Sequence, residues 1–291
     1  MKTLSSIIGN SQKLDGGAMF GHVPKALWSK WLTPDEKNRV TLATRALLIQ
    51  ENDKNILLET GIGAFFEHSL SERYGVEEKN HVLLDSLKKL NLSDSDIDIV
   101  ILSHLHFDHA GGLLSAWEED KEPTLLFPNA KFLVSKDAWD RACNPHERDK
   151  ASFVNKINES LKASGRLVII DNKHSKILSD DYSFLITNGH TPGLMHTVIK
   201  ANDGPIIFAS DLIPGSHWVH LPVGMGYDRL AETLLDEKKD MLEWALANNA
   251  RLFFTHDKDI AMAYVAKDKS GKFIITKEIH DFTKLLEKTT S

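Results

Sequence analysis

The sequence predicts a layered α/β sandwich, and two observations carry this prediction. Segments typical of strands and segments typical of helices alternate along the whole chain, without separate blocks of either kind. The chain has 291 residues, of which 42% are hydrophobic, so it can bury a large core. Because there is no internal repeat, low-complexity segment or long linker, we expect one domain over residues 1–291.

The first half of the chain begins with two paired strands. The apolar runs Val40–Gln50 and Asn55–Gly61 flank a turn-forming segment, as in a hairpin. A helix is predicted over Glu77–Leu90, where apolar residues recur at helical spacing, and a buried strand over Ile97–Leu102. The remaining elements predicted here are a strand at Lys131–Ser135, helices at Lys136–Cys143 and Phe153–Ala163, a strand at Arg166–Ile170, and a protruding helical insertion between Glu118 and Lys162.

The second half continues the alternation. Three strands are predicted within Tyr182–Asp211, with Asn202–Gly204 as a hairpin turn. Leu230–Ala247 has the pattern of an amphipathic helix. Arg251–Thr255 is typical of a buried strand, and Ala261–Lys277 of a final hairpin.

The composition excludes several function classes. The formal net charge is -6 and no dense Lys/Arg stripe is present, so we expect no nucleic-acid partner. Cys143 is the only cysteine, which excludes a disulfide framework within the chain and a Cys-rich zinc site. The opening MKTLSSIIGN lacks the apolar stretch of a signal peptide, and no apolar run is long enough to span a membrane. We therefore expect a cytoplasmic protein without membrane contact.

The most informative stretch is SHLHFDHAGG, Ser103–Gly112, directly after a predicted buried strand. Side chains alternate in an extended segment, so His104 and His106 point the same way and can chelate one ion. Asp108 and His109 follow at the expected start of a helix and can face a second ion. Imidazole and carboxylate suit zinc and similar first-row metals. A surface histidine cluster without metal is the alternative reading.

Three further residues repeat the same arrangement, in which a ligand type follows a strand end. They are His190 in TNGHTPG, Asp211 in IIFASDLIPG and His256 in RLFFTHD. A single residue of this kind is usually a solvated loop residue. Together with the histidine turn, the three predict one site at an edge of the sheets.

The ordered motifs HLHFDH, GHTPG, FASD and FTHD resemble those of the metallo-β-lactamase-fold hydrolases, over nearly the whole chain. The opening LDGGAMFGHVPKALW and the later MGYD resemble the branch of quorum-quenching N-acyl homoserine lactonases and methyl parathion hydrolase. The resemblance implies a four-layer αββα sandwich with two metal ions. It also implies a ligand set: His104, His106 and His190 for one ion, Asp108, His109 and His256 for the other, and Asp211 bridging both.

The chemistry of two divalent ions agrees with this assignment. Two ions roughly 3.5–4 Å apart can share and acidify a water, which gives a bridging hydroxide at neutral pH. One ion can also stabilise the oxyanion that develops on the substrate. Asp108 is predicted to be the catalytic acid, because it can deliver a proton to the leaving alkoxide. No G-x-S-x-G elbow of a serine hydrolase is present.

Two positions depart from the pattern of the family. Glu59 occupies a position where Asp is frequent, and it is either an outer support of a ligand histidine or an acid facing solvent. Some related lactonases carry a Tyr three residues after the bridging Asp, where this chain has Pro214. The first departure concerns the geometry of the metal site, and the second weakens the lactonase assignment.

Several nearby residues have open roles. Of the two histidines in GHTPGLMHT, His190 is the predicted ligand, because glycine and proline around it fix the backbone path. His196 either supports the site from outside or points at the substrate pocket. A loop after Asp211 lines the pocket mouth or is an ordinary surface loop, and its candidates are His217, Trp218 and His220.

These observations predict a dinuclear metal hydrolase that opens the lactone ring of N-acyl homoserine lactones. The alternatives are hydrolysis of another ester, a thioester or a phosphotriester by the same core, and a non-hydrolytic binding or sensor protein. The expected cofactors are two divalent ions, with Zn²⁺ preferred and Mn²⁺, Co²⁺ or Fe²⁺ compatible. The expected partner is a small ester or lactone substrate, and a homodimer is a further expectation.

Overall fold

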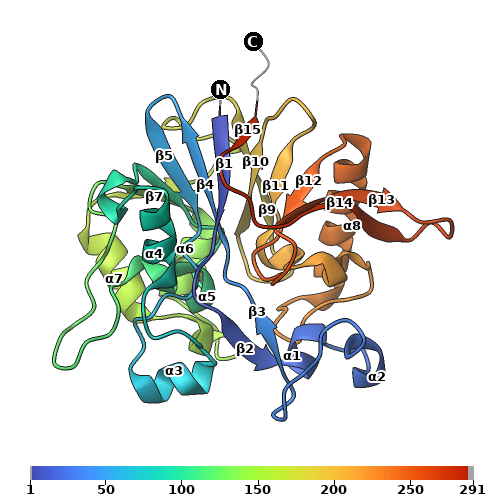
Figure 1. The fold of residues 1–291 in the computed structure, drawn as a ribbon, viewed down its shortest axis with the longest axis horizontal. Helices are drawn as coiled ribbons and strands as arrows, with labels where there is room; N and C mark the ends of the chain where they lie inside the picture. The colour runs from blue at the N-terminus through green and yellow to red at the C-terminus, as the bar shows by residue number, and fades with distance from the viewer. Residues whose placement is uncertain (1, 288–291) are drawn as a thin grey trace. The chain divides into compact units, whose positions relative to one another are not determined.

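Two mixed sheets dominate the structure, one in each of two units of the chain (Figure 1). The structure is a computed structural model, and it describes residues 2–287. Unit 1 consists of residues 2–12, Ala43–Asp171 and Phe282–Glu287, and unit 2 of Lys13–Leu42 and Asn172–Asp281. The mixed α/β class is therefore confirmed, whereas one domain over residues 1–291 stays a prediction.

Unit 1 is built on a seven-stranded sheet. Its strands are β1 (Lys2–Ile7), β4 (Ala46–Glu51), β5 (Lys54–Leu58), β6 (Ile99–Ile101), β7 (Lys131–Ser135), β8 (Leu167–Ile170) and β15 (Leu285–Glu287). The order across the sheet is β15-β1-β4-β5-β6-β7-β8. The pairs from β5 to β8 are parallel and the others antiparallel. Asn52 and Asp53 have φ of 47 and 58° and close the β4–β5 hairpin, a conformation that Asn and Asp tolerate.

The helices of unit 1 follow the parallel strands. They are α3 (His68–Tyr74), α4 (Val82–Lys89), α5 (Phe107–Ala110), α6 (Lys136–Cys143) and α7 (Asn155–Ala163). The Ser135 side chain caps α6 by accepting a hydrogen bond from the Ala138 amide, which explains why the helix begins where the sequence predicted. α4 packs against β1, and α6 packs against β7, β8 and α7 (Figure 1).

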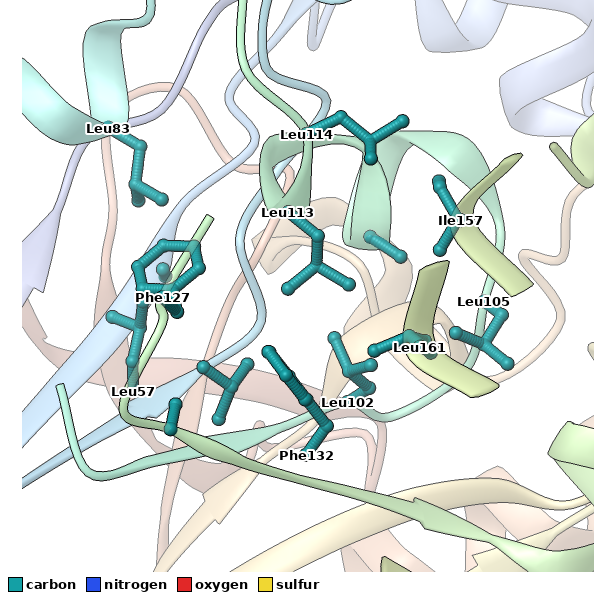
Figure 2. Close-up of a cluster of buried hydrophobic side chains, with 14 of the residues drawn as sticks. Leu57, Leu83, Leu102, Leu105, Leu113, Leu114, Phe127, Phe132, Ile157 and Leu161 are labelled. Carbon is teal, nitrogen blue, oxygen red and sulfur yellow. The ribbon is translucent and has the colours of Figure 1, made fainter. Parts of the chain in front are cut away.

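Apolar side chains from these elements form the core of unit 1. Figure 2 shows Leu57 of β5, Phe132 of β7 and Leu161 of α7 in one cluster, all without solvent exposure. Each such side chain contributes about 1.5–3 kcal/mol through burial. The core thus holds the strand ends of unit 1 in a fixed frame.

Unit 2 is built on a six-stranded sheet in the order β14-β13-β12-β11-β10-β9. Its strands are β9 (Tyr182–Thr187), β10 (Leu194–Ile199), β11 (Ile206–Phe208), β12 (Arg251–Phe253), β13 (Met262–Lys267) and β14 (Phe273–Ile279). Only β11 and β12 pair in parallel. The other elements are β2 (Gln12–Asp15) and β3 (Arg39–Leu42), which pair with each other, and the helices α1 (Gly16–Phe20), α2 (Lys25–Trp28) and α8 (Ala231–Ala247).

The core of unit 2 combines α8 with an aromatic cluster. α8 packs against β13, and its Leu234, Met241 and Leu242 are buried. The Phe20 ring stacks on Trp28 and on Trp218, with centroids 5.6 and 4.6 Å apart. Trp218 also donates a hydrogen bond from Nε1 to the Met19 carbonyl, which anchors its loop to α1.

Two sequence predictions are wrong in this fold. Val40–Gln50 is not one strand, because the chain leaves extended pairing between β3 and β4. There Thr44 lies so close to Gly9 and Gly61 that a Cβ at either glycine would lie within 2.5 Å of a Thr44 oxygen, so this peptide packs tightly against both glycines. The stretch from Glu118 to Lys162 is not an insertion either, because it supplies β7 to the sheet and buried Ile157 and Leu161 to the core.

Three strands and three helices were not predicted from the sequence: β1, β2 and β15, and α1, α2 and α3. β1 and β15 pair with each other, and α1, α2 and α3 are each at most seven residues long. The three helices and the strands β2 and β15 are too short to show a period locally. β1 is six residues long, but it contains two adjacent serines instead of an apolar run. Among the helices that the structure describes, none is long and apolar enough to cross a membrane.

Candidate metal centre

In unit 1 the predicted ligands follow strand ends on one edge of the sheet. β5 and β6 are parallel, so their carboxyl ends lie at the same edge. Glu59 follows β5, and the His-rich turn follows β6 and enters α5. In open α/β sheets this edge is the usual place for a ligand site.

The histidines of this turn pack closely together. The ring centroid of His104 lies 4.4 Å from that of His106 and 4.1 Å from that of His109. All three side chains are buried. Glu59, His104 and His109 each offer a ligand atom, and these atoms lie within 4.8 Å of one another. Buried imidazoles this close are stable together when they are neutral and face a cation.

Asp108 differs from its neighbours in being partly open to solvent. Its side chain is 15% exposed, and its Oδ2 atom lies 3.7 Å from Nε2 of His109. The other predicted ligands of this turn are buried. Asp108 therefore combines proximity to a ligand histidine with access to protons from water.

Glu59 supports His109 from behind, which resolves the two readings of this residue. It is fully buried, and its Oε2 accepts a hydrogen bond from Nδ1 of His109 at 2.9 Å. Its other oxygen accepts from the Ser103 hydroxyl, whose oxygen lies 2.9 Å from Nδ1 of His104. Because a carboxylate only accepts, Nδ1 of His109 carries the proton and Nε2 is left with its lone pair for a metal.

A tight backbone crossing holds the segment that carries His109. The Thr60 amide donates to the His109 carbonyl at 3.0 Å, and the Gly112 amide donates to the Gly61 carbonyl at 2.9 Å. A Cβ at Gly112 would lie 2.1 Å from the Thr60 oxygen, so only glycine fits there. The buried His81 imidazole lies 3.1 Å from the Gly112 carbonyl and braces the same turn.

In unit 2 the register of the sheet also places three strand ends at one edge. β11 and β12 are parallel to each other. β9 and β11 are both antiparallel to β10, so β9 runs in the same direction as β11 and β12. His190 follows β9, Asp211 follows β11 and His256 follows β12. The topology of unit 2 thus brings together three residues from separate stretches of the chain between positions 190 and 256.

Asp211 lies between the two histidines of this edge. Its Oδ2 is 3.2 Å from Nε2 of His190, and its Oδ1 is 3.2 Å from Nε2 of His256. The three side chains are almost entirely buried. One carboxylate therefore offers each of its oxygens to a different imidazole.

Asp228 orients His190 from the opposite side. Its Oδ1 accepts a hydrogen bond from Nδ1 of His190 at 3.0 Å, and its Oδ2 accepts from the Met225 amide at 2.6 Å. The proton therefore sits on Nδ1, and the Nε2 lone pair faces an Asp211 oxygen. Two acceptors 3.2 Å apart need a cation between them, either a proton or a metal ion.

His196 lies outside this group. It is fully buried on β10, and its Nε2 lies 2.8 Å from the Thr187 hydroxyl. Burial lowers the pKa of His196 to about 4, so the imidazole stays neutral at physiological pH. The imidazole thus contacts β9, and its role as an outer support of the site stays a prediction.

The loop after Asp211 contains the other residues of open role. Trp218 is buried, whereas His217 and His220 stack on Trp31 with centroids 5.8 and 5.6 Å apart. Burial lowers the pKa of His217 and of His220, so both are neutral at pH 7. The loop is attached close to His256, because the His256 amide donates to the Pro214 carbonyl and Asp257 accepts from the Ser216 amide.

The donor set in each unit fits a first-row metal ion. The candidate ligands are imidazole nitrogens and carboxylate oxygens, without thiolate. In each unit a carboxylate accepts a hydrogen bond from Nδ1 of a candidate ligand histidine, as is typical of metal sites. His104, His106, Asp108 and His109 lie together in unit 1, and His190, Asp211 and His256 lie together in unit 2. The grouping of all seven around two ions stays a prediction.

Sequence reasoning assigned no role to several supporting residues. Ser103 directly precedes the candidate ligand His104 in SHLHFDHAGG, so its proximity was a usable signal, whereas Asp228 ends MGYD, which contains no candidate ligand. His81 lies far from the motifs along the chain, and no local pattern marks it.

Comparison with known proteins identifies the family. A family model described as the metallo-β-lactamase superfamily matches residues 40–256, which include every predicted ligand. The chain belongs to this superfamily. The family recognised from the sequence motifs is thus confirmed, and the mixed α/β structure matches the superfamily fold.

Curated members of the superfamily are similar to this chain at low identity. An N-acyl homoserine lactonase of Bacillus sp is 25% identical over 246 residues, covering 78% of this chain and 85% of the relative. A probable metallo-hydrolase of Bacillus subtilis (strain 168), YflN, is 20% identical over 199 residues, covering 66% and 67%.

Two solved structures have a similar fold over nearly the whole chain. A probable metal-dependent hydrolase from Staphylococcus aureus has a TM-score of 0.84 and 26% identity, and the match covers 96% of this chain and 98% of that chain. AidC, a dizinc quorum-quenching lactonase solved with a product, has a TM-score of 0.73 and 24% identity, with 94% of both chains covered. The second likeness shows the fold alone.

Proposed function

We propose that this protein is a dinuclear metal-dependent hydrolase that opens the lactone ring of N-acyl homoserine lactones. The proposed ligands are His104, His106 and His190 for one ion, Asp108, His109 and His256 for the other, and Asp211 for both. Zn²⁺ is the proposed metal, because its preference for imidazole and carboxylate matches the donor set. We also propose that the enzyme acts in the cytoplasm on a small-molecule substrate.

The observation that carries the proposal is the placement of Asp211. Each of its oxygens lies 3.2 Å from Nε2 of a different histidine, which is what a carboxylate shared by two cations requires. A single ion would need only one of these oxygens. The carboxylate partners of His109 and His190 add support, because they leave Nε2 of both rings ready to bind metal.

The substrate class is supported by the relatives and by the chemistry of the donors. Several relatives are named N-acyl homoserine lactonases, at about 25% identity and below. When bound, two divalent ions supply an acidified water and polarise the carbonyl of an ester. The chain itself must then protonate the leaving alkoxide, and the partly exposed Asp108 carboxyl is suited to that transfer.

A metal analysis combined with a substrate panel tests the proposal. We expect close to two metal equivalents per chain and ring opening of acyl homoserine lactones. The panel also contains aryl esters, thioesters and phosphotriesters. Protein that stays without metal after addition of Zn²⁺ or Mn²⁺ would refute the site. Cleavage of phosphotriesters or thioesters without lactone opening at any acyl length would refute the substrate class.

A further inference from the structure

Residues 228–237 of unit 2 hold the turn that carries His190 through its backbone. This segment runs from Asp228 into the second turn of α8. Besides the bond from His190 to Asp228, it contacts the peptide groups on both sides of Gly189. The orientation of His190 therefore depends on contacts that lie outside any metal-binding motif.

Glu237 makes the most specific of these contacts. Its Oε1 accepts from the Asn188 amide at 2.8 Å, and its Oε2 accepts from the Gly189 amide at 2.9 Å. One carboxylate thus binds two successive amides, and hydrogen bonds to a charged acceptor are stronger than those to a neutral one. The two amides directly precede the amide of His190.

The carbonyl side of Gly189 is held equally firmly. Its oxygen accepts from the Arg229 amide at 2.9 Å and from the Leu230 amide at 2.8 Å. A Cβ on Gly189 would lie 2.3 Å from the Cα of Leu234, so the turn rests on the backbone of α8. Asn188 also closes the turn, because its Oδ1 accepts from the Gly193 amide at 3.0 Å.

We propose that Glu237 is a positioning residue for His190, an inference that rests on the proposed function. Its carboxylate fixes the amides that precede His190, while Asp228 fixes the ring. Helix formation alone does not require this residue, since any good helix former suits a half-buried position on α8. Only a carboxylate of this length presents two parallel acceptors to neighbouring amides.

Glu237→Gln tests the inference with little change in shape. A carboxamide keeps one acceptor and turns its NH₂ group toward an amide donor, so one of the two bonds is lost. Glu237→Asp keeps the charge but is one methylene shorter, so it cannot reach both amides. The matched control is Glu243→Gln on the same helix, where the carboxylate is half exposed and only 3.9 Å from Lys239.

The measurement is Zn²⁺ affinity by chelator competition, together with the visible spectrum of the Co²⁺-loaded proteins. We expect one of two metal equivalents to bind about 10–100-fold more weakly in both Glu237 variants, with an altered Co²⁺ spectrum. The other equivalent and the Glu243→Gln control should stay at wild-type affinity. A purely structural role would weaken both equivalents alike and leave the Co²⁺ spectrum unchanged, which would overturn the inference.

The remaining outcomes separate this inference from the proposed function. If the wild type binds two metal equivalents and Glu237→Gln binds both with unchanged affinity, only the positioning role is overturned. If Glu237→Gln does not fold, the same result with a folded Glu237→Asp decides the question. A wild-type protein that binds no metal would overturn both.

Discussion

At the scale of single residues, the candidate site is defined by which atom of each histidine is already engaged. Glu59 and Asp228 accept hydrogen bonds from Nδ1 of the candidate ligands His109 and His190, so only Nε2 of each ring is available for a metal. His196 is also buried, but its Nε2 contacts the Thr187 hydroxyl. The imidazoles that contact the Asp211 oxygens are those of His190 and His256. The two histidines of GHTPGLMHT thus have different contacts in the structure.

Substitution of these two histidines should therefore have unequal effects. His190→Ala is expected to lose most of one metal equivalent and nearly all activity, because a ligand is removed. His196→Ala should keep both equivalents and lose about 10–100-fold in activity, as for other changes behind a metal ligand. Metal titration of both purified variants is the measurement. Loss of metal from the His196 variant alone would show that the assignment is reversed.

The buried His196 also predicts how stability depends on pH. Its pKa is about 4 in the folded protein, below the ordinary value of 6.5, because of burial. The unfolded chain therefore takes up a proton between these values while the folded protein does not, so stability falls as the pH is lowered from about 6.5 to about 4. At about 1.4 kcal/mol per pKa unit, this loss is about 3 kcal/mol.

Urea unfolding of the metal-free protein at several pH values checks this expectation. The wild type is compared with His196→Gln, which has no titrating group at this position. The difference in unfolding free energy between the two proteins should be constant above pH 7. Toward acid pH, the wild type should lose stability relative to His196→Gln. A difference that does not vary with pH would contradict the role of His196.

Asp108 allows a kinetic prediction. If its carboxyl protonates the leaving alkoxide, Asp108→Asn should slow esters with poor leaving groups far more than activated aryl esters, since only the former need the proton. Turnover of both ester types is measured with metal content monitored. Equal losses on the two substrates at unchanged metal content would exclude the general-acid role.

At the scale of elements, turns rather than strands determine where the ligands lie. The segment after β5 crosses the segment after α5 so closely that their backbones touch at Gly112 and Thr60. Glu59 and Gly61 have φ of 62 and 67°, so the chain reverses sharply in this crossing. The buried Lys238 of α8 plays a comparable part in unit 2, where Nζ donates to the carbonyls of Trp218, His220 and Val223.

Gly112→Ala should therefore disturb both stability and the metal site. The added methyl group would lie 2.1 Å from the Thr60 oxygen, which forces two backbones apart. Overpacking of this kind costs roughly 1–3 kcal/mol in unfolding free energy. Urea unfolding measures the loss, and metal titration should show weaker binding through displacement of His109. The control is Gly226→Ala, whose methyl group would meet no atom closer than 3.3 Å. Equal stability of the two variants would contradict the importance of the crossing.

At the scale of the whole molecule, each unit has its own sheet, its own core and its own share of the candidate ligands. The match to the superfamily extends over residues 40–256 and supports the reading of the chain as a metal-dependent hydrolase. Identities of about 25% and below to the named lactonases support the family, and the substrate itself has to be determined by assay.

Metal removal should lower stability as well as activity. A ligand that binds only the folded state stabilises it by about 2.7 kcal/mol when present at 100 times its dissociation constant. Dialysis against a chelator is expected to lower the melting temperature and abolish hydrolysis, and added Zn²⁺ should restore both. Thermal unfolding with and without chelator is the measurement. A melting temperature that does not respond to metal would contradict a metal-binding folded state.

The sequence by itself determined the fold class, the family and the candidate ligands. Short-range patterns carry this information: HLHFDH places four donors in one turn, and helices such as Lys136–Cys143 are marked by their own periodicity and cap. Tertiary structure alone decided the remainder. The break in Val40–Gln50 depends on packing of Thr44 against Gly9 and Gly61, and the burial of Glu59 against His109 depends on a contact 50 residues away. Such contacts follow from how strands align and cores close, and no local sequence pattern encodes them.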